Sequence, residues 1–310
     1  MRLYIYFIFI IVVCPISVNF SQRIEIPRNE RVYGVTKLRS EIFVLCRLSS
    51  PSPTVIRVHE DRNPFRCQRN ITMDRIKGPF DIGSSEKNNC LYVCDAWEKC
   101  VWKITRKTHD QYNIVKWVNT YYDPYTLSVS INGQLLMVNW APNILMIYGS
   151  DAERVRSIKL PNDIEKPLHA VETSTGNFIV LHFWVEKEKG ECWSGRRELE
   201  TKLVVSELSR DGQMVIRRFF PSSETQELKY GDYLSLDAED RVFVADSKND
   251  RVVLLDSDLK WNQILCPTQI EKEEATIRQP RRLCYDDERK QLIVGGYLED
   301  VVNIYTLSGN

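Results

Sequence analysis

Short runs of apolar, β-favouring residues recur along the whole chain, and each is followed by a polar turn. This is the pattern of a buried strand that ends at a hairpin. The runs begin at positions 42, 91, 136, 178, 242 and 292, so the intervals between them are 49, 45, 42, 64 and 50 residues. The one long interval contains a polar segment at 186–202, and without that insertion the spacing stays in the mid-forties. A period of roughly 40–50 residues is typical of stacked four-stranded units.

Each unit contains further strand-like segments around its central run. A preceding segment opens at a turn residue, as in 78–85 (GPFDIGSS) and 230–237 (YGDYLSLD). A third segment follows the turn, and five units continue into a more polar fourth segment. The sixth unit ends without one, whereas 23–27 (RIEIP) near the N-terminus has the expected pattern. We therefore predict an all-β, six-bladed β-propeller with four-stranded antiparallel blades, in which an N-terminal strand closes the ring and covers its open edge. The alternative, a two-domain β-sandwich, predicts no fixed period.

The first residues have a different composition from the rest. Met1 and Arg2 precede twelve consecutive apolar residues, and Pro15 and small polar residues follow. This pattern indicates a secretory signal peptide, and the run is shorter than the roughly 20 apolar residues of a membrane-spanning helix. A membrane anchor is the alternative. We expect a signal peptide at 1–21, a propeller at 22–310, and a secreted protein with no stable membrane span after removal of the signal.

Loss of Cys14 with the signal leaves eight cysteines, an even number that favours disulfides in an oxidising compartment. Segment 90–104 (CLYVCDAWEKCVWKI) holds three of them. A hairpin with a five-residue turn from position 95 sets Cys94 opposite Cys100, which makes them the leading disulfide pair. Cys90 needs another partner, or replaces Cys94 if the turn is tighter. Zinc is the alternative, but it needs four ligands at other spacings, and no histidine is near.

The charge balance and the candidate chemistry limit the function further. The chain has 42 basic and 42 acidic residues, which argues against a general nucleic-acid binder. No serine-hydrolase elbow occurs, and two of the four histidines, His169 and His182, fall in one unit. We therefore predict no cofactor and expect a protein that is not an enzyme. Acidic residues after the first strands of units five and six are potential calcium ligands at a channel mouth, although such residues more often form turns.

Two hairpins carry a resemblance to a known family. Segments 242–255 (VFVADSKNDRVVLL) and 91–104 resemble the NHL-repeat propeller, in which an apolar strand ends in aspartate and a polar turn leads to Arg-Val. The matching residues are Asp95, Asp246, Asn249 and Arg251. The other units lack the aspartate, and sister propeller families are the alternative. The resemblance covers about 23–307 and implies a six-bladed propeller. A secreted lyase of similar fold holds zinc with histidines from several blades, a pattern that this sequence does not show.

Loops on a rigid scaffold are the usual recognition elements of such folds. The longest loop and unit six supply aromatic residues and arginines, which are enriched in binding hot spots. The candidate binding residues are Trp184, Trp193, Arg196, Arg197, Arg281 and Arg282. The two arginines of unit six could meet an acidic ligand or pair with nearby carboxylates. The tryptophans of strands and turns, such as Trp97, are expected to pack between blades.

Asn70 begins an Asn-Ile-Thr sequon and is the predicted glycosylation site. We expect a secreted, non-enzymatic β-propeller that binds a protein or glycan partner through its loop face. A secreted metal-dependent lyase or hydrolase on the same scaffold is the alternative.

Overall fold

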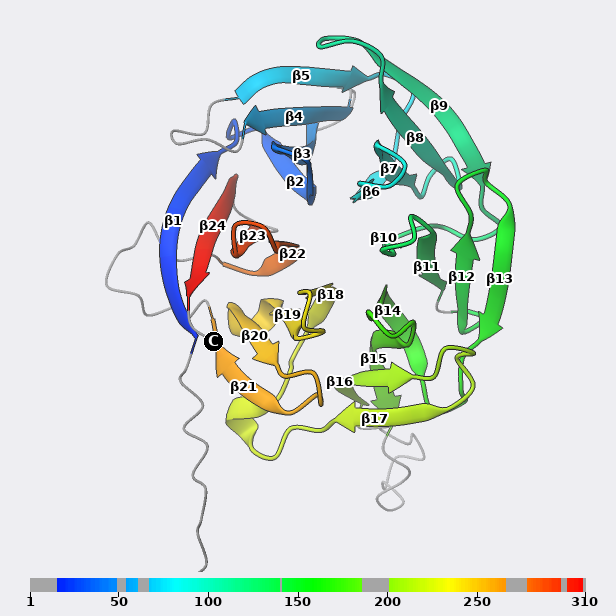
Figure 1. The fold of residues 1–310 in the computed structure, drawn as a ribbon, viewed down its shortest axis with the longest axis vertical. Coiled ribbons are helices and arrows are strands. Elements are labelled where there is room, and N and C mark those ends of the chain that lie inside the picture. Colours follow the sequence, from blue (N-terminus) through cyan, green and yellow to red (C-terminus); the bar gives the residue numbers. More distant parts are fainter. Residues whose placement is uncertain are drawn as a thin grey trace, which may run out of the picture.

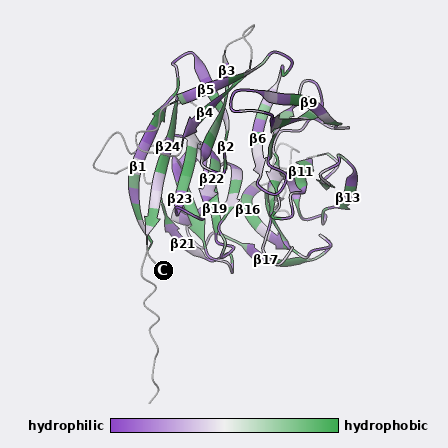
Figure 2. Cartoon of the chain, turned by 45° about the horizontal axis from the view of Figure 1, so that its top comes forward, coloured by the Kyte–Doolittle hydropathy of each residue, from purple (hydrophilic) through white to green (hydrophobic). Residues whose placement is uncertain are grey.

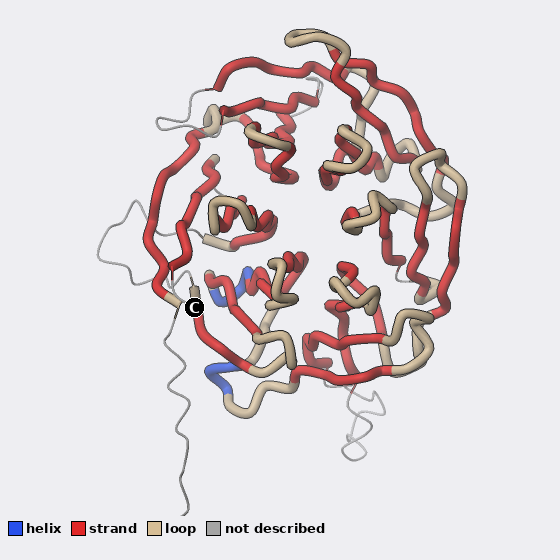
Figure 3. The backbone as a smooth tube through the Cα atoms, in the orientation of Figure 1, coloured by secondary structure: helices blue, strands red, loops and turns tan. Residues whose placement is uncertain are grey.

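The computed structural model describes residues 16–48, 54–60, 67–139, 141–185, 201–265, 278–296 and 300–308 of the chain. Six four-stranded antiparallel sheets form a ring around a central channel (Figure 1). Apart from two 3₁₀ turns, η1 (Glu224–Gln226) and η2 (Ser247–Asn249), the described residues form strands and loops (Figure 3). The predicted six-bladed propeller is confirmed.

In every blade the first strand lies at the channel and the fourth at the rim. Blade one contains β2 (Glu30–Leu38), β3 (Glu41–Leu48), β4 (Thr54–Glu60) and β5 (Cys67–Met73). Blade two contains β6 (Pro79–Ser85), β7 (Cys90–Asp95), β8 (Cys100–Arg106) and β9 (Tyr112–Asn119). Blade three contains β10 (Ser128–Val129), β11 (Leu135–Asn139), β12 (Ile144–Tyr148) and β13 (Arg154–Lys159).

The second half of the ring repeats this order. Blade four contains β14 (Glu165–Glu172), β15 (Phe178–Val185), β16 (Thr201–Leu208) and β17 (Val215–Phe219). Blade five contains β18 (Gly231–Leu236), β19 (Val242–Asp246), β20 (Arg251–Leu255) and β21 (Trp261–Ile264). Blade six contains β22 (Pro280–Asp286), β23 (Gln291–Gly296), β24 (Val301–Ser308) and β1 (Ser17–Glu25).

The N-terminal strand β1 closes the ring, as the sequence predicts. It pairs antiparallel with β24 from Ser17 opposite Ser308 to Glu25 opposite Val301, and Ile24 is buried there. The strand extends back to Ser17, so the last residues of the predicted signal peptide pair with β24 in this structure. Residues 1–15 lie outside the described residues, and the cleavage site stays a prediction. No helix of the described part of the chain is long and apolar enough to cross a membrane.

The hydrophobic core is divided among the interfaces between blades. Six clusters of buried side chains each combine residues of two neighbouring blades, and Figure 2 shows the hydrophobic residues concentrated along the strands. The second and third strands of a blade therefore pack against one neighbouring blade on one face and against the other neighbour on the opposite face. This explains why those strands read as continuous apolar runs rather than as alternating ones.

The register of the hairpin between β7 and β8 differs from the predicted one by one residue. Cys94 lies opposite Val101, and Cys100 lies opposite Asp95, because Asp95 is still part of the strand and the turn has four residues. Adjacent positions of a strand point to opposite faces, so Cys94 packs toward blade three and Cys100 toward blade one. The expected cross-strand position of a Cys94–Cys100 disulfide is therefore wrong, and Cys90, Cys94 and Cys100 are free thiols in this structure.

The aspartates of the NHL-like pattern organise their turns through hydrogen bonds. Asp246 Oδ2 accepts hydrogen bonds from Asn249 Nδ2 and Arg251 Nε, both at 2.7 Å, and Asp246 is fully buried. Asp95 accepts from the backbone N–H groups of Lys77, Gly78 and Glu98 at 3.0–3.1 Å. These side chains therefore join the second strand of a blade to the connection that leads into the blade.

Candidate functional site

The ring has two faces, one at each end of its central axis. We call the first the loop face, because it carries the connections between blades and between second and third strands, including 95–100, 120–127 and 220–230. The opposite face, here called the hairpin face, carries the turns between first and second strands, including 86–89, 173–177 and 287–290.

An ion pair between the innermost strands of blades six and two lies between these faces. Arg282 on β22 and Asp81 on β6 are buried, with side-chain exposures of 4% and 0%, and Arg282 Nε lies 3.3 Å from Asp81 Oδ1. Arg282 also donates to the carbonyl oxygens of Tyr33 at 2.8 Å and Phe80 at 2.7 Å. Asp81 accepts two backbone N–H groups at 2.9 Å. Burial raises the pKa of Asp81 to about 6, although the charge of Arg282 opposes this change.

His169 and Tyr233 extend this network across the channel. The N–H of Leu234 donates to His169 Nδ1 at 3.2 Å, so the ring hydrogen is on Nε2, which donates to the carbonyl oxygen of Leu127 at 3.2 Å. The Tyr233 hydroxyl donates to the same carbonyl at 3.2 Å, and the two rings stack with centroids 3.9 Å apart. Burial lowers the pKa of His169 to about 3. The imidazole is therefore neutral, and both of its nitrogens are used.

The two arginines predicted as binding residues are both paired with carboxylates. Arg282 belongs to the buried network, and Arg281 Nε lies 2.7 Å from Asp232 Oδ2. Of the two possibilities that the sequence leaves open, the structure shows the pairing with nearby carboxylates.

The longest loop of the sequence is described only in part. Trp184 is the last residue but one of β15, is half-buried and meets Phe220 edge to face, with centroids 5.4 Å apart. Trp193, Arg196 and Arg197 lie outside the described residues.

Asn70, the predicted glycosylation site, lies on the outer strand β5 and is exposed. Its side-chain oxygen accepts a hydrogen bond from Arg57 Nη1 at 3.2 Å. The position is accessible to solvent, and the modification stays a prediction.

The remaining histidines do not converge on the channel. His182 lies within blade four, where Nε2 is 2.8 Å from Ser206 Oγ and burial lowers its pKa to about 4. His59 is on the third strand of blade one, and His109 is on the turn between β8 and β9. Within the described ranges, no three or more histidine, cysteine, aspartate or glutamate side chains form a group that could hold a metal ion.

Exposed aromatic side chains gather on the loop face. Those of the described residues are Trp97, Tyr121, Tyr125, Phe220 and Tyr230, and all lie in its connections. Tyr121 is 83% exposed and Trp97 is 61% exposed, which corrects the expectation that Trp97 packs between blades. The sequence did not identify these residues, because neither periodicity nor composition reveals which loop aromatic remains uncovered.

Two arginines on the same face stack on these rings. The guanidinium of Arg47 lies 4.3 Å from the centroid of Trp97, and that of Arg218 lies 5.7 Å from the centroid of Phe220. Nearer the channel, Phe80 packs edge to face between Tyr33 and Tyr125, with centroids 6.2 and 5.0 Å away. Aromatic and arginine side chains thus occur on this face both near the first strand of blade two and in the connections farther from the axis.

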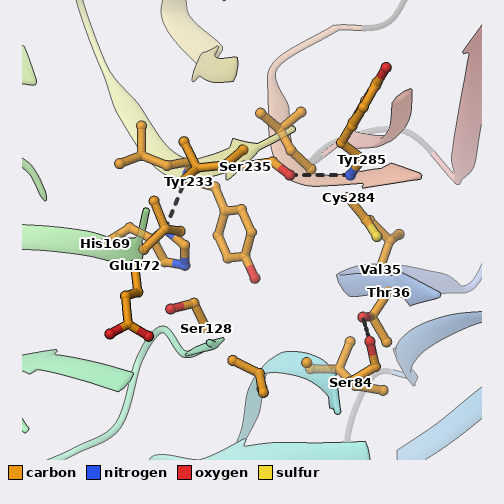
Figure 4. Close-up of a pocket in the computed structure, with 17 residues that line it drawn as sticks. Val35, Thr36, Ser84, Ser128, His169, Glu172, Tyr233, Ser235, Cys284 and Tyr285 are labelled. Atoms are coloured by element: carbon orange, nitrogen blue, oxygen red, sulfur yellow. Dashed lines mark hydrogen bonds between the residues drawn. The ribbon is translucent and has the colours of Figure 1, made fainter. Parts of the chain in front are cut away.

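On the hairpin face the channel contains a cavity of about 210 Å³, which the first strands of all six blades line (Figure 4). We call it the vestibule. His169 and Tyr233, two members of the buried network, form part of its wall. The labelled polar side chains of the vestibule include Thr36, Ser84, Ser128, Glu172 and Ser235.

The fold and these two faces define the chain as a six-bladed β-propeller, a fold that many solved structures share. No protein-family model and no curated protein sequence matches it. Hydrazine synthase from Kuenenia stuttgartiensis has a TM-score of 0.64 and 13% identity, over 92% of this chain and 97% of that one. A catalytically inactive virginiamycin B lyase from Staphylococcus aureus with quinupristin has a TM-score of 0.61 and 11% identity, over 94% and 100%. YCF48 bound to D1 peptide has a TM-score of 0.54 and 10% identity, over 89% and 79%. At these identities the likeness shows the fold alone.

Proposed function

We propose that this chain is a secreted, non-enzymatic β-propeller that binds a protein partner through its loop face. The gathering of the exposed aromatic side chains on that face is the observation that carries the proposal. Grouped exposed apolar surface is a recurrent mark of interaction sites on soluble proteins. The loop connections are held by a rigid ring, which lowers the entropy lost when a partner binds.

The channel supports a function other than catalysis. A general base or a nucleophile needs a side chain that is free to reach a substrate. His169 uses both nitrogens, and the carboxylate of Asp81 is held by Arg282 and by two backbone N–H groups. These groups therefore hold the innermost strands of several blades together.

We also propose that the protein is related to the NHL-repeat propellers. The turn that joins Asp246, Asn249 and Arg251 by hydrogen bonds is the local feature that supports it. We infer that the chain is a divergent NHL-like propeller in which the hairpin of β19 and β20 keeps the pattern most fully.

A protein is a better match to the loop face than a glycan. Two of the exposed rings are stacked with arginines, and tryptophan, tyrosine and arginine are the residues most enriched in protein hot spots. Such rings present a large rigid area with little side-chain entropy to lose.

The experiment compares two double variants in the secreted full-length protein. Trp97→Ala with Tyr121→Ala removes two aromatic side chains from the loop face, and Met214→Ala with Ile216→Ala removes two exposed apolar side chains of blade four. We expect that a partner cross-linked to the unmodified protein in conditioned medium is lost with the first variant and kept with the second. Each hot-spot truncation costs about 2 kcal/mol or more of binding free energy.

Three results would overturn parts of this proposal. If both variants capture the partner equally well, the loop face is not the binding site. Aromatic-dependent binding to a glycan array without a protein partner would change the class of ligand. A chain that stays inside the expressing cells with an intact N-terminus would contradict secretion.

A further inference from the structure

The vestibule on the hairpin face has a polar lining that accepts hydrogen bonds rather than donating them. Thr36 Oγ1 donates to Ser84 Oγ at 2.9 Å, and Ser84 Oγ donates to the carbonyl oxygen of Lys37 at 2.6 Å. Ser128 Oγ donates to the carbonyl oxygen of Ala170 at 2.6 Å. Since a hydroxyl has one hydrogen and two lone pairs, these side chains offer mainly lone pairs to the cavity.

One carboxylate faces the same space. Glu172 is the charged residue among the described residues that line the vestibule, and no lysine or arginine accompanies it there. Its Oε2 atom is buried and has no hydrogen-bond partner among the described residues. Figure 4 shows this carboxylate on the same side of the cavity as the Ser128 hydroxyl. A carboxylate with a buried oxygen that lacks a partner is costly, and a cation beside its other oxygen would reduce that cost.

The outer mouth of the vestibule is acidic. A wider hollow of about 590 Å³ adjoins it on the hairpin face and shares Ser84, Cys284 and Tyr285 with it. Four carboxylates and two basic side chains line this hollow: Glu86, Asp286, Asp287, Glu288, Lys37 and Arg39. Lys37 is paired with Asp286. Clefts lined mainly by one sign of charge concentrate ligands of the opposite sign.

From these observations we propose that the vestibule is a binding site for a small organic cation with a primary ammonium group. The ammonium would pair with the Glu172 carboxylate through the oxygen other than the buried Oε2, and it would also donate to the neighbouring hydroxyl lone pairs. The apolar side chains between them, such as Val129, Val171 and Leu283, would contact its alkyl chain. The volume equals the share of about seven water molecules in the liquid, which suits a ligand with a short chain.

Other ligand classes match the lining less well. An anion would meet Glu172 without a cation to balance it. A neutral polyol would bring donors and acceptors to walls whose hydroxyl hydrogens are mostly engaged. A bare metal ion needs several ligands, and the described residues contain no group of three suitable side chains. The site is on the face opposite the proposed protein-binding surface, so the two proposals can fail separately.

Isothermal titration calorimetry with the alkyl diamine cadaverine tests this proposal on the full-length mature protein. We expect one site per chain with a dissociation constant of about 1 mM or tighter. The neutral diol of the same chain length and calcium chloride serve as the other two titrants, and neither should bind or displace the diamine. Saturable binding of the diol, displacement by stoichiometric calcium, or the absence of diamine binding would each overturn the proposal.

A pair of charge variants tests the position of the site. Glu172→Gln keeps the size of the side chain and removes its charge, and we expect about tenfold weaker diamine binding, since a charge-assisted hydrogen bond becomes a neutral one. Glu153→Gln makes the same change at an exposed position of the hairpin face in blade three and should leave the affinity unchanged. Equal affinities for both variants would refute the assignment. If Glu172→Gln does not fold, Ser128→Ala gives the same comparison with a smaller expected loss of binding.

Discussion

Replacement of Arg282 by methionine tests the physical account of the buried network. Methionine keeps much of the length of the side chain and removes its charge. The change leaves the carboxylate of Asp81, which is fully buried, without its cation. It also removes the donors that the carbonyl oxygens of Tyr33 and Phe80 now have at 2.8 and 2.7 Å.

The expected cost follows from this burial. Breaking a buried ion pair by removing one partner typically lowers the free energy of unfolding by about 3–5 kcal/mol. The neighbouring Arg281 provides a matched control, because its pair with Asp232 is more exposed, at 26% and 12%. Partly exposed pairs contribute about 0–1 kcal/mol, so Arg281→Met should change stability by no more than that.

The cost of Arg282→Met should depend on pH through Asp81. Its pKa is higher in the folded protein, about 6, than in the unfolded chain. The folded state therefore binds more protons between these values, and the free energy of unfolding falls as pH rises through this window. Without Arg282 the pKa of Asp81 in the folded protein rises further. In the variant, the free energy of unfolding therefore keeps falling toward pH 7, by about 1.4 kcal/mol per pH unit. The deficit of the variant should be about 1–2 kcal/mol larger at about pH 7 than at about pH 5.

Denaturant unfolding of the unmodified protein and the two arginine variants at both pH values provides the measurement. If Arg282→Met lowers the free energy of unfolding by less than about 1 kcal/mol, the ion pair behaves like a solvent-exposed one and the account of a buried pair is wrong. A large deficit that is the same at both pH values would show that Asp81 is not the group left unpaired.

Two further predictions concern a turn and the cysteines. Asp246→Ala removes three hydrogen bonds from a buried carboxylate and should cost about 3 kcal/mol or more of unfolding free energy. Asn139→Ala, at the equivalent position of blade three, removes one bond of 3.3 Å to a backbone N–H and should cost about 1 kcal/mol; equal losses in denaturant unfolding would contradict the structural role of Asp246. In the reduced native protein, alkylation should label the exposed Cys67 first and leave Cys46 intact, because burial raises the pKa of the Cys46 thiol well above its usual range. Peptide mass spectrometry would contradict this if both were labelled at the same rate.

The register at Cys94 differs from the predicted one by one residue. The sequence predicts a turn that begins at residue 95, whereas the turn between β7 and β8 begins at residue 96, and a shift of one residue moves a side chain to the other face of a blade. The four residues of the turn, 96–99, lie within the predicted turn, whereas Asp95, which the prediction includes, belongs to β7. Whether Asp95 still pairs within the strand depends on its hydrogen bonds to the preceding connection, which the hairpin sequence alone does not contain.

The sequence by itself determined the number of blades, the order of their strands and the closure by the N-terminus. These features depend on strand propensity, turn residues and a repeat period, all of which are local in the chain. The tertiary structure alone decided which side chains meet across the channel. Arg282 and the Phe80 carbonyl are 202 residues apart, and Glu172 and Ser128 come from different blades. Their proximity depends on how six twisted sheets close into one ring, and no local pattern encodes that distance.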